Sequence, residues 1–126
     1  MIVDYHFIQI YFLGAIYMGR LSNKVAIITG AAQGMGAAHA RLFIEQGAKV
    51  VLTDLNEEKG NTLAAELGEN ALFVKQNVTS EEDWATVVAK AEEAFGPVNV
   101  LVNNAGITMA KNMLDITVEE YRRIVE

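Results

Sequence analysis

Residues 29–36 read Thr-Gly-Ala-Ala-Gln-Gly-Met-Gly and separate the apolar run of residues 25–28 from an alanine-rich segment. The apolar run predicts a strand, and the alanine-rich segment predicts a helix. Gly30 lets the chain turn sharply off the strand, where a Cβ would clash. Gly34 lets the backbone come close to a ligand, and Gly36 lets the new helix pack against the strand. A strand, a glycine turn and a helix start indicate a phosphate-binding site, because the first helical N–H groups lack partners and the helix dipole is positive there.

The spacing of these glycines is G-x-x-x-G-x-G. It is therefore neither G-x-G-x-x-G nor a P-loop, which would continue with Gly-Lys-Ser or Gly-Lys-Thr. Alone, the stretch could also be an ordinary glycine-rich turn. The phosphate site is favoured because three further polar stretches follow predicted strands along the chain.

Composition limits the classes of protein. The 126 residues form one domain at most, and an apolar fraction of 52% with a charged fraction of 21% predicts a buried core. The formal net charge of −6, with acidic residues spread among basic ones, argues against nucleic acid as a partner. The absence of cysteine excludes disulfides, zinc–thiolate sites and a cysteine nucleophile. We expect no metal site, and a cytoplasmic location.

Residues 1–18 differ from the rest, because they are rich in aromatic and β-branched side chains. No Lys or Arg precedes the apolar stretch, as a signal peptide would require. Asp4, His6 and Gln9 interrupt it, which disfavours a membrane span, so a membrane is not an expected partner. We expect a domain over residues 19–126 preceded by an extension. That extension is either upstream and non-essential or a packing or oligomer-contact segment, with a membrane anchor as the least favoured alternative.

Apolar runs alternate with helical patterns along the chain. The predicted strands are residues 25–29, 48–53, 71–75 and 98–102, and the predicted helices are residues 35–46, 57–67, 81–95 and one beginning at residue 118. Such alternation predicts βαβ units and a parallel sheet. With right-handed crossovers, the expected fold is α/β, a Rossmann-type doubly wound parallel sheet that is incomplete, with about four strands in the order 3-2-1-4.

Asp54 follows the second predicted strand, 24 positions after Gly30 (54 − 30). This is near the spacing at which a carboxylate meets the adenosine ribose of NAD. A carboxylate accepts hydrogen bonds from ribose hydroxyls and repels a 2′-phosphate, so Asp54 predicts NAD in preference to NADP. The alternative role for Asp54 is to cap the next helix. His39, inside the first predicted helix, is interpreted as a helix-surface or partly packed residue rather than a catalytic one.

Four stretches together resemble the N-terminal half of a short-chain dehydrogenase/reductase, over about residues 19–126. They are the T-G-x-x-x-G-x-G motif of residues 29–36, Asp54, Asn77-Val78-Thr79 and residues 103–106, Asn-Asn-Ala-Gly. The pattern is similar to NAD-dependent alcohol and 3α(20β)-hydroxysteroid dehydrogenases. The resemblance implies that the pyrophosphate and adenosine side of the cofactor is surrounded by Gly30, Gln33, Gly34, Met35 and Gly36. It implies that Asp54 and Leu55 meet the ribose and that Asn77 and Val78 lie by the adenine. Asn104, Ala105 and Gly106 would also border the ribose.

Two departures from the family pattern stand out. At Asn77 the family often has Asp, and Asn Oδ1 can accept from the adenine amino group more weakly than a carboxylate. The resemblance also implies catalysis by a Tyr with a Lys four residues later, together with a Ser and an Asn. The four tyrosines of this chain are Tyr5, Tyr11, Tyr17 and Tyr121, and in no case is the residue four positions later a lysine. We therefore expect this chain to contain the cofactor-binding half of such an enzyme and none of its catalytic residues.

The sequence thus predicts the NAD(H)-binding part of an oxidoreductase that interconverts a secondary alcohol and a ketone by hydride transfer. The resemblance implies a small-molecule alcohol or ketone substrate and a homo-oligomer for the complete enzyme. The 126 residues by themselves are not expected to turn over. The alternatives are a non-catalytic dinucleotide-binding module and a gene fragment without function.

Overall fold

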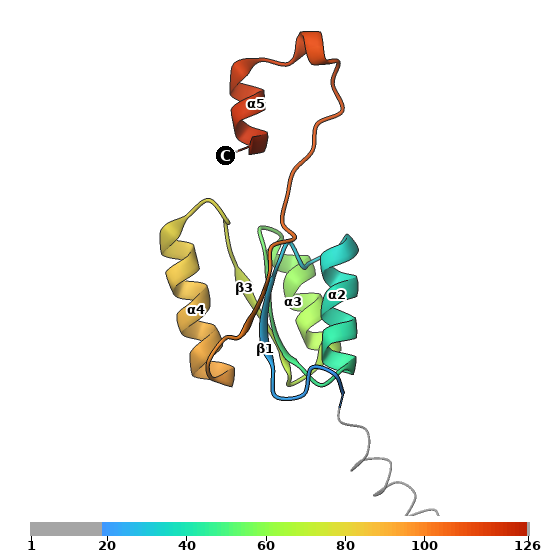
Figure 1. Cartoon of the computed structure of the whole chain (residues 1–126), viewed down its shortest axis with the longest axis vertical. Coiled ribbons are helices and arrows are strands. Elements are labelled where there is room, and N and C mark those ends of the chain that lie inside the picture. Colours follow the sequence, from blue (N-terminus) through green and yellow to red (C-terminus); the bar gives the residue numbers. More distant parts are fainter. Residues whose placement is uncertain (1–18, 126) are drawn as a thin grey trace, which may run out of the picture.

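The computed structural model describes residues 19–125, so the expectations for residues 1–18 lie outside the described part. It contains a parallel sheet with helices on both faces (Figure 1). In chain order the elements are β1 (Val25–Thr29), α2 (Gly34–Glu45), β2 (Lys49–Asp54), α3 (Glu57–Leu67), β3 (Ala71–Lys75), α4 (Glu81–Phe95), β4 (Val100–Val102), the 3₁₀ helix η1 (Met113–Asp115) and α5 (Val118–Val125).

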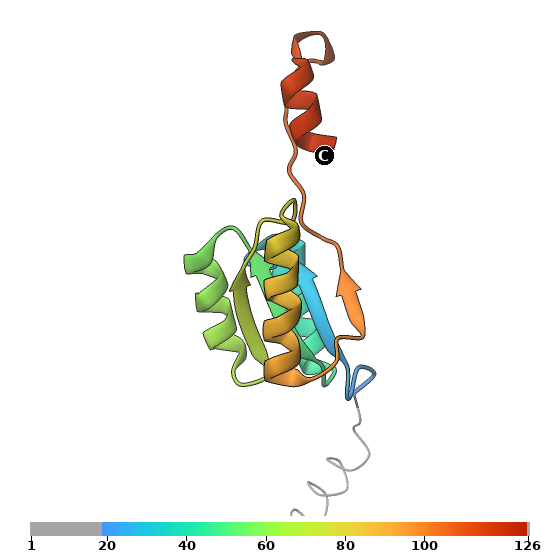
Figure 2. The ribbon, with the colours of Figure 1, turned by 90° about the vertical axis from the view of Figure 1, so that its left-hand side faces the viewer.

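The sheet has the order β3-β2-β1-β4, and every neighbouring pair is parallel, which confirms the predicted topology. Helices α2 and α3 cover one face and α4 covers the other (Figure 2). The carboxyl ends of all four strands therefore share one edge of the sheet, and residues 103–112 leave from this edge toward α5 (Figure 1). Among residues 19–125, no helix is long and apolar enough to cross a bilayer.

The core lies on both faces of β1 and β2. All five residues of β1 are buried, as the continuous apolar run predicts for a strand covered on both sides. Because side chains alternate along a strand, Ile28 and Leu52 pack under α2 and α3, whereas Ile27 and Val51 pack under α4. This two-sided burial fixes β1 and β2 as the frame for the loops that follow them.

Element ends differ from the predictions by one or two residues. Helix α2 begins at Gly34 rather than residue 35, and β2 covers Lys49–Asp54 rather than residues 48–53. Strand β4 begins at Val100 rather than residue 98. Just before it, the Asn99 N–H donates to the Val25 carbonyl at 3.0 Å, and the Val25 N–H donates to the Asn99 side-chain Oδ1 at 2.9 Å. The 3₁₀ helix η1 lies in a segment where a loop is predicted.

Helix α5 begins at Val118, as predicted, and its N-terminus is a capping box. Thr117 Oγ1 accepts the Glu120 N–H at 3.2 Å, and Glu120 Oε2 accepts the Thr117 N–H at 2.9 Å. The Thr117 N–H and the Lys111 ammonium lower the pKa of Glu120 to about 2. Apolar side chains of α5 nevertheless stay more than half exposed, namely Val118, Tyr121 and Val125.

Three polar side chains are buried near the carboxyl ends of the inner strands and of β3. They are Thr29, Thr53 and Gln76, each at most 2% exposed. Thr29 is fully hydrogen-bonded, but Thr53 Oγ1 and both amide atoms of Gln76 have no hydrogen-bond partner within residues 19–125. An unpaired buried polar group costs about 1–3 kcal/mol, so these two side chains reduce the stability of the fold.

We expect Gln76→Leu to raise the free energy of unfolding by about 1–2 kcal/mol, because an apolar side chain of similar size replaces an unpaired buried amide. Urea unfolding followed by circular dichroism measures the change. Gln76→Glu is the matched comparison and should destabilise, since it buries a charge. A Leu variant no more stable than the unsubstituted protein would contradict the prediction.

Candidate functional site

The three glycines of residues 30–36 serve different purposes. Gly30 has φ +62°, and a Cβ there would lie 2.8 Å from the Ala105 Cα. A Cβ on Gly36 would lie 2.3 Å from the Gly30 carbonyl oxygen. Gly34 has φ +58°, but a Cβ there would meet no atom within 4 Å. Packing therefore requires Gly30 and Gly36 to lack a side chain, whereas Gly34 borders open space where a ligand can approach the backbone.

The N-terminus of α2 is left without side-chain partners. Gln33 is the N-cap residue, yet its side chain makes no cap hydrogen bond, and the first turn holds no acidic residue. By contrast, Asn56 and Ser80 cap α3 and α4 with their side chains, and acidic residues fill the first turns of both helices. The positive end of α2 and its N–H groups are therefore available to an anion, as the diphosphate of a dinucleotide would require.

Asp54 joins the end of β2 to the glycine turn. Its Oδ2 accepts the Ala32 N–H at 3.1 Å, and its Oδ1 accepts the Asn56 N–H at 3.0 Å. Asn56 is the residue that caps α3, by accepting the Lys59 N–H at 3.0 Å, so the alternative role of Asp54 as helix cap is wrong. A carboxylate has about four acceptor positions, and two of them remain for a ligand.

Thr29 and Asn104 tie the end of β1 to the segment after β4. Thr29 Oγ1 accepts the N–H groups of Asn104 and Ala105, each at 3.0 Å, and donates to the Val102 carbonyl at 3.4 Å. Asn104 Nδ2 donates to the carbonyls of Thr29 at 2.9 Å and Gly30 at 3.1 Å. Sequence reasoning did not assign Thr29 this role, because nothing in the sequence shows which residues its hydroxyl meets across the sheet.

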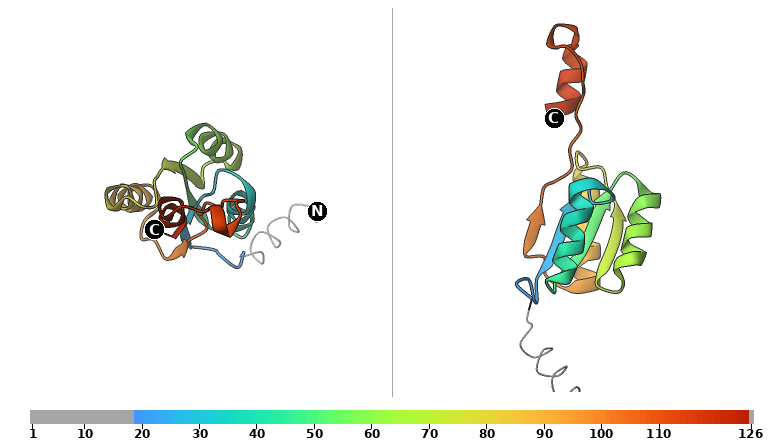
Figure 3. Two further views of the ribbon diagram at one scale, coloured as in Figure 1. Left: turned by 90° about the horizontal axis from the view of Figure 1, so that it is seen from above. Right: turned by 90° about the vertical axis from the view of Figure 1, so that its right-hand side faces the viewer.

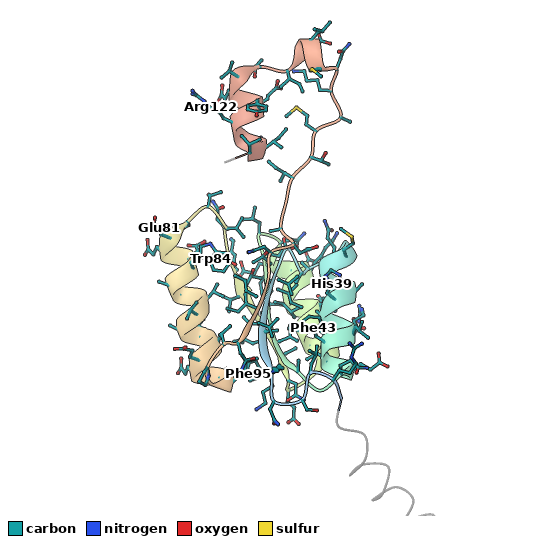
Figure 4. All side chains as sticks on the ribbon, viewed as in Figure 1. His39, Phe43, Glu81, Trp84, Phe95 and Arg122 are labelled. Atoms are coloured by element: carbon teal, nitrogen blue, oxygen red, sulfur yellow. The ribbon has the colours of Figure 1, made fainter. Side chains whose placement is uncertain are left out.

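The loop after β3 folds on itself. Asn77 Oδ1 accepts from both the backbone N–H and the hydroxyl of Thr79, at 3.1 and 2.9 Å. Both lone pairs of this oxygen are thereby used, so an adenine amino group could reach it only by displacing Thr79. The Val78 carbonyl accepts from Trp84 Nε1 at 2.9 Å, which links the loop to α4, where Figure 4 labels the indole.

Three apolar side chains at this edge are exposed. Met35, Leu55 and Val78 are 73%, 64% and 38% exposed, although they are apolar. Exposed apolar side chains around a polar turn are typical of a ligand site. His39 is exposed on α2, in agreement with its interpretation as a surface residue (Figure 4). Within residues 19–125 no three His, Asp or Glu side chains are grouped as metal ligands would be.

A groove of about 390 Å³ runs beside the glycine turn, between α2 and α3, which lie side by side on one face of the sheet (Figure 3). Gln33 and Arg41 border it from α2 and its N-cap, and Lys59 and Glu66 border it from α3. Lys59 Nζ donates to Gln33 Oε1 at 2.8 Å and so crosses the groove. Sequence reasoning missed Lys59, because the pattern of α3 does not show which side chain reaches the turn.

The chain is similar to proteins of known family. A model of the short chain dehydrogenase family matches residues 24–126. The 3-beta-hydroxysteroid dehydrogenase of Comamonas testosteroni is 45% identical over 107 residues, which are 85% of this chain and 42% of that protein. The NADP-dependent (R)-specific alcohol dehydrogenase of Lentilactobacillus kefiri is 43% identical over 108 residues, 84% of this chain and 43% of that protein.

A solved structure has the same fold. The crystal structure of a 3-ketoacyl-(acyl-carrier-protein) reductase from Brucella melitensis, complexed with NADH, matches with a TM-score of 0.80 and 42% identity. The match covers 83% of this chain and 44% of that one. The chain therefore spans less than half the length of the relatives it matches.

Proposed function

Since the chain belongs to the short-chain dehydrogenase family, we propose that residues 19–126 form the dinucleotide-binding part of an oxidoreductase that uses NAD(H). In this proposal the complete enzyme interconverts a secondary alcohol and a ketone, and the nicotinamide ring supplies the hydride chemistry. The relatives named as hydroxysteroid and alcohol dehydrogenases support this substrate class.

The residues present fit a dinucleotide. Gly34 offers open backbone beside the uncapped end of α2, where the diphosphate would be held together with Gly30, Gln33, Met35 and Gly36. Asp54 and Leu55 would border the adenosine ribose. Further along the same edge of the sheet, Asn77 and Val78 would border the adenine, and a hydrogen bond to Asn77 Oδ1 would require Thr79 to be displaced. Asn104, Ala105 and Gly106 would border the ribose.

The preference for NAD over NADP is supported by the pair of hydrogen bonds that Asp54 accepts from the N–H groups of Ala32 and Asn56. They hold the carboxylate against the glycine turn and leave two acceptor positions, which match the two hydroxyls of an unmodified ribose. A 2′-phosphate would replace one of these donors by a negative charge beside the carboxylate. The relatives include both an NADP-dependent enzyme and an NADH complex, so Asp54 and not family membership supports this choice.

We expect the purified chain to bind NADH at least tenfold more tightly than NADPH, and Asp54→Asn to reduce or reverse this ratio, because the substitution removes the repulsion of the 2′-phosphate. Quenching of Trp84, which is the single tryptophan and contacts the loop after β3, measures both affinities. Isothermal titration calorimetry provides a second measurement without fluorescence.

Asp115→Asn is the matched control, because Asp115 is an exposed acid in η1, away from the glycine turn. It should leave both affinities unchanged. Absence of NADH binding to the folded chain would contradict the proposed function. An unchanged ratio in Asp54→Asn would contradict only the choice of cofactor.

We also propose that the complete enzyme is a homo-oligomer acting on a small-molecule alcohol or ketone. The exposed apolar side chains of α5 support an assembly, since Val118, Tyr121 and Val125 would be costly to leave in water.

A further inference from the structure

Four hydrogen bonds join residues around the end of β2 in a closed circuit. Asp54 Oδ2 accepts the Ala32 N–H, and Asp54 Oδ1 accepts the Asn56 N–H. Asn56 Oδ1 accepts the Lys59 N–H, and Lys59 Nζ donates to Oε1 of Gln33, the residue after Ala32. We call these five residues the Asp54 circuit. The carboxylate of Asp54 and the ammonium of Lys59 are thus held in the same ring of hydrogen bonds.

The Lys59 ammonium fixes the orientation of the Gln33 amide. An ammonium group has three donors and no acceptor, so it binds the amide oxygen and not the amide nitrogen. The Gln33 NH₂ group then has two N–H donors that make no hydrogen bond within residues 19–125. Gln33 is the N-cap of α2, so these donors belong to the turn that would hold the cofactor.

The charge of Lys59 is not neutralised by an ion pair, in contrast to that of Arg41 across the same groove. Arg41 pairs with Glu66, and this hydrogen bond lowers the pKa of Glu66. Among residues 19–125, no carboxylate lies within 4 Å of Lys59 Nζ, whose partner is the neutral Gln33 amide. Lys59 therefore contributes a positive charge beside the turn, and that charge is available to an anionic group of a ligand.

We propose that Lys59 is a second residue that sets the choice of cofactor, and that it acts against Asp54. This inference rests on the proposed function, in which the adenosine ribose lies against Asp54. Asp54 favours the free 2′-hydroxyl, whereas the Lys59 ammonium and the Gln33 NH₂ group favour a 2′-phosphate. The site then holds a latent phosphate subsite that the Asp54 charge masks, and removing this one charge exposes it.

The groove gives the 2′-phosphate room. Its volume of about 390 Å³ exceeds that of a phosphate group several-fold, and Gln33 and Lys59 both line it. The Lys59 side chain has a flexible stem of four carbons, so the ammonium can adjust its position to the phosphate without a shift of α3.

The test compares 5′-AMP with adenosine 2′,5′-bisphosphate, which differ only in the 2′-phosphate. Calorimetry gives both affinities for the whole chain carrying Asp54→Asn, with and without Lys59→Met. We expect Asp54→Asn to raise the affinity ratio of bisphosphate to AMP by about tenfold or more, and Lys59→Met to remove most of this gain. Lys59→Arg keeps the charge and should preserve the gain.

Lys90→Met in the same Asp54→Asn background is the matched control, because Lys90 is an exposed lysine on α4, on the opposite face of the sheet. It should leave the affinity ratio within about twofold. Circular dichroism melting of each variant verifies folding.

Two results would overturn the inference while the proposed function stands. In the first, NADH binds but Lys59→Met changes the affinity for neither nucleotide. In the second, Lys59→Met weakens both nucleotides equally, which would reveal a purely structural role of the Asp54 circuit. If NADH and both adenine nucleotides fail to bind the folded unsubstituted chain, the proposed function fails and the inference with it.

Discussion

Gly36→Ala is expected to destabilise the fold by about 3 kcal/mol or more and to abolish nucleotide binding. The added Cβ would lie 2.3 Å from the Gly30 carbonyl oxygen, 2.6 Å from Asn104 Nδ2 and 2.8 Å from the Ala31 Cα. Two of these atoms are backbone atoms of the glycine turn, so the turn itself must move to relieve the overlap. Urea unfolding and NADH titration measure the two effects.

Gly106→Ala is the matched control on the same edge of the sheet. A Cβ at Gly106 meets no atom within 4 Å, and its φ is not in the left-handed region. We expect its free energy of unfolding to stay within about 0.5 kcal/mol of that of the unsubstituted protein. If Gly36→Ala were equally harmless, close packing of α2 against the turn would be refuted.

Thr29→Val is expected to lower the free energy of unfolding by about 2–4 kcal/mol, although the two side chains have nearly the same shape. The hydroxyl accepts two N–H groups, from Asn104 and Ala105, and donates to Val102. Thr29 is 1% exposed, so water cannot replace these bonds without a rearrangement. The substitution leaves two part-buried N–H groups unpaired, at a cost of up to about 1–3 kcal/mol each.

Thr53→Val is the opposite case at the neighbouring position, because Thr53 is the register partner of Thr29 on β2. It is 0% exposed, and its hydroxyl has no hydrogen-bond partner within residues 19–125. We expect this substitution to be neutral or stabilising by about 1 kcal/mol. Equal effects at the two threonines in chemical denaturation would contradict the hydrogen-bond assignment.

The order and type of the elements could be predicted from the sequence because local signals agree with the fold. The continuous apolar run of β1, the glycine turn and the caps Asn56 and Ser80 each identify an element without reference to its neighbours. The start of β4 could not be predicted, since the Val25 N–H is bonded to the side chain of Asn99, a residue 74 positions away.

The positions of the candidate site residues could be predicted where the glycine turn or the end of a strand indicates them. Gly30, Gly34 and Gly36 follow from the turn, and Asp54 follows from its place at the end of a strand. Lys59 has no such signal, because its meeting with Gln33 depends on how α3 is placed against α2. The use of Asn77 Oδ1 by Thr79 likewise appears only in the folded loop.

The glycine turn is hydrogen-bonded to two parts of the sheet that differ in their resistance to local unfolding. On one side the turn is bonded to β2, an inner strand, through Thr53 and Asp54. On the other it is bonded to Asn104, which follows β4, a three-residue strand paired on one edge only within residues 19–125. Short outer strands open locally at low free-energy cost, whereas inner strands open only with the whole domain. Within residues 19–125, the β2 side of the glycine turn is therefore the better preorganised of the two.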